Sequence, residues 1–91
     1  MTDSPQRPRI TWDDSRMQTA FANVVNVQGT QEQVDIYLGT NRGLMAGESE
    51  AVTVDLSNRV ILTPLAAMRL WTVLGGVLQE HETRYGALKL D

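Results

Sequence analysis

The feature that most constrains this chain is a strand that passes directly into a helix. Within residues 59–71, the apolar run 60–62 is followed at once by Thr63 and Pro64. Threonine is a favoured N-cap because its hydroxyl accepts a backbone N–H of the first helical turn. Proline suits the first helical position because an N–H there has no partner within the helix. The junction therefore predicts antiparallel strands first and one long helix after them.

The helix is predicted to run from Pro64 to about Tyr85, with Gly86 as a glycine terminator. At 100° per residue, one side of it forms an apolar arc. The apolar arc consists of Ala67, Leu70, Trp71, Leu74, Val77, Leu78, His81 and Tyr85. The opposite side is polar. Trp71 is expected to be a core residue against the sheet, because large aromatic side chains dominate small cores.

Two strands are predicted before the junction, over residues 21–28 and 34–38. In the second, Val34, Ile36 and Leu38 alternate with Asp35 and Tyr37, which is the period of a strand with one buried face. The polar turn 29–33 between them is too short for a parallel crossover, so the pair is expected to form an antiparallel hairpin.

A third strand is predicted over residues 51–62, after a loop at 39–50 that contains three glycines. Ser57 and Asn58 interrupt its apolar pattern, which indicates either a bulge or a bend in one long strand, or a tight turn between two short ones. The expected fold class is α+β, an antiparallel sheet of three to four strands with one long C-terminal helix packed on it. Residues 1–18 are expected to be a flexible polar arm and residues 19–91 a single domain.

Composition excludes several classes of function. A chain of 91 residues forms one small domain, and without cysteine it has no disulfide or thiolate metal site to stabilise it. The net charge of −3 argues against nucleic-acid binding, which a basic surface normally supports. No apolar run reaches about 18 residues, so membrane insertion is not expected. The N-terminus lacks the apolar core of a signal peptide, and a cytoplasmic location is expected.

No pattern of catalytic or ligand-binding residues is evident. His81 is the single histidine, and its neighbours Glu80 and Glu82 point about 100° away from it on a helix, so the three form no chelate. A partly buried, hydrogen-bonded structural role is expected for His81. The glycine loop lacks the Gly-Lys-Ser/Thr ending of a phosphate-binding loop. We expect no catalytic residue, metal or cofactor, and no enzymatic activity.

The apolar residues exceed what one helix can cover. The first strand carries Val24 on one side and Phe21, Val25 and Val27 on the other, and a wet apolar face on a small domain usually marks an interface. Two glycines in mid-helix, Gly75 and Gly76, fit either a close neighbouring backbone or a local kink. A homodimer or tetramer is expected. The candidate interface residues are Phe21, Val25, Val27, Tyr37, Arg42, Leu44, Met45, Gly75, His81 and Tyr85.

Three segments, 21–27, 34–39 and 59–70, together resemble a family of short bacterial proteins of unknown function, number three-four-six-seven in its series. The likeness consists of an aromatic-small-Asn opening, an acidic-apolar second strand, and a junction of Arg, three apolar residues, Thr or Ser, and Pro before a helix that ends in Tyr-Gly or Phe-Gly, here Tyr85-Gly86. Gln28 and Gly29 depart from the commoner His and Ser. The resemblance implies the fold and carries no activity. The order of strands then helix is also similar to oligomeric export chaperones of the SecB type, an analogy of topology alone.

Two hypotheses about function follow. The first is a small non-enzymatic protein-interaction module, a homo-oligomer that binds another protein as an accessory subunit, assembly factor or chaperone-like binder. The alternative is a homo-oligomer that binds or transforms a small ligand at a site between subunits, around His81, Arg84 and Tyr85.

Overall fold

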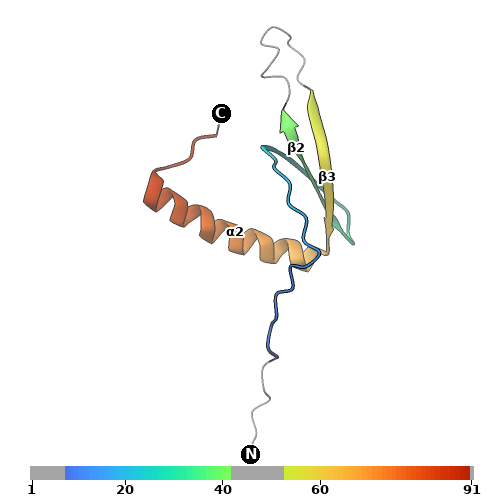
Figure 1. Ribbon diagram of the computed structural model, residues 1–91. Coiled ribbons are helices and arrows are strands. Elements are labelled where there is room, and N and C mark those ends of the chain that lie inside the picture. The colour runs from blue at the N-terminus through green and yellow to red at the C-terminus, as the bar shows by residue number, and fades with distance from the viewer. Residues whose placement is uncertain (1–7, 42–52, 91) are drawn as a thin grey trace, which may run out of the picture.

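The computed structural model describes residues 8–41 and 53–90, and within these it contains one sheet and one helix (Figure 1). Strands β1 (Val24–Gly29), β2 (Val34–Asn41) and β3 (Val54–Leu62) are antiparallel, with β2 in the middle. Helix α2 (Pro64–Tyr85) follows β3. The predicted class, an α+β fold with an antiparallel sheet followed by one C-terminal helix, is confirmed.

The hairpin between β1 and β2 is closed by Thr30. Its backbone N–H donates to the carbonyl oxygen of Gln33 at 2.9 Å, and its hydroxyl oxygen accepts the N–H groups of Glu32 and Gln33 at 3.2 and 3.3 Å. A threonine side chain in this position satisfies turn amides that have no ladder partner. β1 begins at Val24 rather than at Phe21, so the first strand is shorter at its start than predicted.

A β-bulge interrupts β3 at Ser57. Leu38 pairs with Asn58 and Gly39 with Leu56, so Ser57 has no opposite residue on β2. The strand continues through this point from Val54 to Leu62. The structure thus settles the alternative left open by the sequence: residues 57 and 58 belong to a bulge in one strand and not to a turn between two strands.

The junction between β3 and α2 has the predicted cap. The Thr63 hydroxyl oxygen accepts the N–H of Ala66 at 3.1 Å, its carbonyl oxygen accepts the N–H of Ala67 at 2.9 Å, and Pro64 opens the helix. At the other end, Gly86 has φ 98° and donates its N–H to the carbonyl oxygen of Glu82 at 2.9 Å. A positive φ combined with ψ 165° suits only glycine, which explains the end of the helix.

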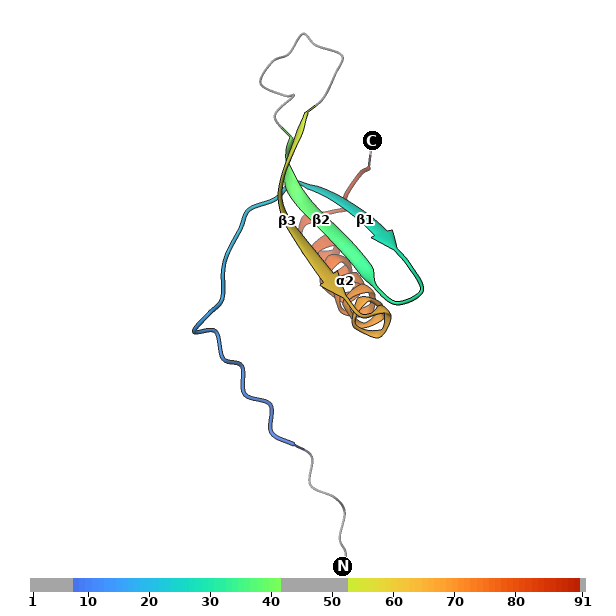
Figure 2. The ribbon, with the colours of Figure 1, turned by 90° about the vertical axis from the view of Figure 1, so that its right-hand side faces the viewer.

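The helix does not lie across the sheet, in contrast to the expected packing. It projects away from the β3 end of the sheet (Figures 1 and 2). Ala66 and Ala67 next to the junction are partly buried, whereas residues 68–80 are all exposed. Trp71, expected in the core, is 74% exposed. The physical reason is the connection, because a single capped residue leaves no chain with which to fold the helix back; such connections usually need 2–6 residues.

Residues 8–23 precede the sheet as an extended segment with one local turn. The Met17 N–H donates to the carbonyl oxygen of Asp14 at 3.1 Å, and the Asp13 carboxylate accepts the Ser15 N–H at 3.1 Å. That hydrogen bond from Ser15 lowers the pKa of Asp13, because it stabilises the charged form. The segment runs outward from the sheet (Figure 2). Trp12 within it is exposed.

Candidate interaction surface

The two faces of the sheet differ in chemistry. Paired residues in the register share a face, and alternate residues along each strand point to opposite faces. One side, here called the apolar face of the sheet, is formed by Val25, Val27, Val34, Ile36, Leu38, Val60 and Leu62. The alternation predicted for Val34, Ile36 and Leu38 is therefore confirmed. Val25 and Val27 of β1 extend the same face.

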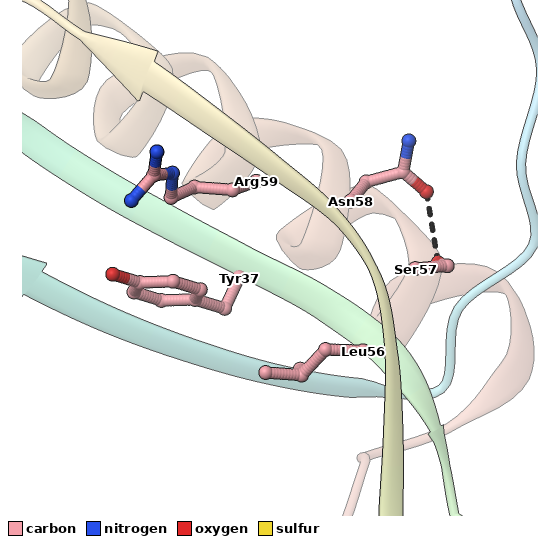
Figure 3. Close-up of a pocket in the computed structure, with 5 residues that line it drawn as sticks. All are labelled: Tyr37, Leu56, Ser57, Asn58 and Arg59. Atoms are coloured by element: carbon pink, nitrogen blue, oxygen red, sulfur yellow. Dashed lines mark hydrogen bonds between the residues drawn. The ribbon is translucent and has the colours of Figure 1, made fainter.

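The opposite face is mixed. Tyr37 pairs with Arg59 across β2 and β3, and Figure 3 shows both projecting from the same side of the sheet as Leu56. With Ser57 and Asn58 they line an open depression of about 290 Å³. The Ser57 hydroxyl lies 2.8 Å from the Asn58 side-chain oxygen and 3.4 Å from the Leu38 carbonyl oxygen. This depression is shallow and partly polar, and none of its side chains forms an acid–base pair.

The helix leaves the sheet on the side of the apolar face. In Figure 3 it lies behind the sheet, away from Tyr37 and Arg59. The apolar arc of the helix is also uncovered. Leu74 and Leu78 near its middle are 46% and 43% exposed, and Trp71, Val77 and Tyr85 are more exposed still. The apolar face and the apolar arc together bound an open region, which we call the open angle.

The described residues bury no hydrophobic side chain. Among the described residues, Gly39 alone is buried. Burial of apolar surface is the main favourable term in folding, and soluble monomers rarely leave large contiguous apolar surfaces in water. A sheet and helix arranged in this way thus lack the contacts that normally hold such elements in place.

The structure separates the predicted interface residues into groups. Val25 and Val27 lie on the apolar face of the sheet, and Gly75, His81 and Tyr85 lie on the helix. Tyr37 lies on the mixed face.

Phe21 lies just before β1 and is exposed. Arg42, Leu44 and Met45 fall outside the described residues. The predicted interface set does not include three residues that the structure leaves exposed, Trp71, Leu74 and Val60. The helical periodicity did place Trp71 and Leu74 on the apolar arc, but the arc was assigned to the chain's own sheet.

His81 is partly buried, as expected, but its expected hydrogen bond is absent. Its ring lies against Tyr85, with centroids 4.8 Å apart and planes at 53°. Its Nδ1 atom is buried and has no hydrogen-bond partner among the described residues. Within residues 8–41 and 53–90, no three histidine, aspartate or glutamate side chains gather as metal ligands do. Among the described residues, the contact that positions the His81 ring is therefore its packing against Tyr85.

Among the described elements, no helix combines the length and the apolar character needed to cross a bilayer.

The fold and the surface together define a small α+β protein in which an apolar sheet face and an apolar helix arc border the open angle. The chain belongs to the family described as "Protein of unknown function (DUF3467)", whose model matches residues 1–90. This confirms the resemblance carried by the strand–Thr-Pro–helix junction. No curated protein and no solved structure shows a significant match to the chain.

Proposed function

We propose that the protein is a non-enzymatic interaction module that works as a homo-oligomer and binds another protein, as an accessory subunit, assembly factor or chaperone-like binder. One observation carries the proposal: the apolar face of the sheet and the apolar arc of the helix are both uncovered in the single chain. Without a neighbour, the two surfaces would remain in water, which is unfavourable for a domain this small.

The self-association part is tested with a matched pair of charge substitutions. Val27 lies on the apolar face and the preceding residue, Asn26, lies on the mixed face opposite Tyr37, and both are exposed in the single chain. In a monomer, Val27→Asp and Asn26→Asp would both be surface changes of similarly small effect, within about 0.5 kcal/mol. In an oligomer that covers the apolar face, Val27→Asp places an unpaired charge in the interface, and we expect it to dissociate the assembly. Asn26→Asp is expected to leave the assembly intact. Equal assembly of the two variants would contradict the proposal.

The hetero-binding part is tested by affinity capture from native lysate at physiological salt. The wild-type chain is compared with Arg59→Ala, because Arg59 lines the depression on the mixed face, opposite the apolar face that the proposed self-association covers. We expect the wild type to retain one or a few proteins that are absent from a tag-only control, and the variant to retain less of them. If nothing is enriched above the tag-only control, this part of the proposal is wrong.

A further inference from the structure

The helix α2 is as long as the apolar face of the sheet, and both surfaces are apolar. Helix α2 has 22 residues, which is about 33 Å at 1.5 Å per residue. β3 has nine residues, which is about 30 Å at 3.3 Å per residue. A helix of this length is therefore long enough to cover the apolar face from end to end.

The chain's own helix is held away from that face by the junction. Thr63 is the single residue between β3 and α2, and its conformation (φ −66°, ψ 154°) is fixed by the cap on Ala66 and by Pro64 on its C-terminal side. Folding the helix back over the sheet would require the cap to open and the last residues of β3 or the first turn of α2 to unwind. A helix that covers the apolar face would therefore have to come from another chain.

Both surfaces offer large apolar side chains to a partner. Nine exposed residues on the two surfaces have exposed fractions between 41% and 74%, namely Val25, Val27, Val60, Leu70, Trp71, Leu74, Val77, Leu78 and Tyr85. Trp71 and Tyr85 are the aromatic members of this set, and aromatic side chains of roughly 150–250 Å² each dominate the energetics of interfaces.

Between two copies, one arrangement covers both surfaces at once. Pairing of helix with helix would leave the apolar face of the sheet in water, and pairing of sheet with sheet would leave the apolar arc in water. We infer that two copies of this chain form a reciprocal dimer in which the helix α2 of each packs across the apolar face of the other's sheet. A two-fold axis makes this exchange self-complementary, since the helix of each copy covers the apolar face of the other. The inference rests on the proposed function and specifies the geometry of its self-association.

The test uses the absence of cysteine from the chain, so that each introduced thiol is unique. Two differently tagged chains are co-expressed, one carrying Leu74→Cys on the apolar arc and the other Val60→Cys on the apolar face. Treatment with a short bismaleimide is expected to give a product that carries both tags. The matched control is Ile61→Cys, since Ile61 is the next residue and is similarly exposed (50% against 43% for Val60) but lies on the mixed face. It is expected to give at least tenfold less cross-linked product.

A second pair of cysteine substitutions keeps the test decisive if the first pair fails to fold. Val27→Cys is combined with Leu74→Cys, and Gln28→Cys serves as its control, because residues 27 and 28 lie on opposite faces of β1. Circular dichroism of each purified variant confirms that the strands and helix are retained. The apolar-face thiol is again expected to cross-link in preference to its neighbour.

Each other outcome overturns the inference in a distinguishable way. Equal cross-linking from both faces, or none from either, in a protein that still sediments as an oligomer, excludes helix exchange and leaves the proposed function standing. A single chain carrying both Val60→Cys and Leu74→Cys that cross-links internally shows that the helix covers its own sheet. A wild-type chain that sediments at 10.1 kDa overturns the inference and the self-association proposal together.

Discussion

Gly39 lies directly against the backbone of Leu56 at the bulge in β3. A Cβ atom at Gly39 would sit 3.0 Å from the Cα of Leu56 and closer still to the carbonyl oxygen of Asp55. Backbone atoms cannot move aside as a flexible side chain can. The absence of a side chain at residue 39 is therefore what allows β2 to pair with a bulged β3.

Gly39→Ala is consequently expected to destabilise the fold, by about 1–3 kcal/mol or more, as overpacking does. Gly29→Ala is the control, because a Cβ there meets its nearest neighbour, the Gln33 carbonyl oxygen, at an ordinary 3.7 Å. Urea unfolding followed by circular dichroism measures the difference. Two variants of equal stability would show that the bulge does not depend on a glycine opposite it.

The cap at the strand–helix junction gives a second prediction. Thr63→Ala removes the oxygen that accepts the Ala66 N–H at 3.1 Å and should lower the free energy of unfolding by about 1 kcal/mol. Thr63→Ser keeps the acceptor and should lose much less. The comparison is made in urea melts, and similar losses for alanine and serine would mean that the hydroxyl is not acting as a cap.

The C-terminal end of the helix gives a third prediction. Gly86 has φ 98° and ψ 165°, a conformation that other residues adopt at a cost of order 1–3 kcal/mol. Gly86→Ala is expected to destabilise the last helical turn, with no clash involved, because a Cβ there would meet nothing within 4 Å. Hydrogen exchange at residues 82–85 locates the effect. Unchanged protection in that turn would contradict the prediction.

The paired glycines in mid-helix test whether another backbone approaches the helix. In the single chain, a Cβ at Gly75 or at Gly76 meets nothing within 4 Å, so each alanine should stabilise an isolated helix by about 1 kcal/mol. We predict instead that Gly75→Ala, next to the apolar arc, destabilises the oligomer, and that Gly76→Ala is neutral or stabilising. Thermal melts together with sedimentation show whether Gly75→Ala raises or lowers the stability of the oligomer. A Gly75→Ala variant at or above wild-type stability, with assembly unchanged, removes the close approach.

Local signals in the sequence were sufficient for the elements and their order. The Thr63-Pro64 pair located the start of the helix at the residue where it begins, and the alternation from Val34 to Leu38 located the central strand. Short-range rules work here because capping and strand alternation are properties of adjacent residues. The extension of β2 to Asn41 was missed, because Gly39 is unfavourable in a strand except where another backbone comes close.

The candidate surface was predictable only in part. Helical periodicity identified the apolar arc correctly, but it cannot say which surface the arc covers. The assignment of Trp71 to the core assumed that the helix returns over its own sheet. Whether a helix returns depends on the length and the geometry of its connection, and a single residue at the junction carries no hydrophobic pattern that would reveal this. The surface that the apolar arc covers is a long-range property, which depends on the connection at Thr63 and, in the proposed assembly, on a second chain.

Sedimentation equilibrium of the wild-type protein at low micromolar concentration, with circular dichroism on the same sample, tests the central claim most directly. The uncovered apolar face and apolar arc predict a folded species of at least twice 10.1 kDa, with no folded monomer at that concentration. A folded protein that sediments at 10.1 kDa, with its strands and helix intact, would contradict the account.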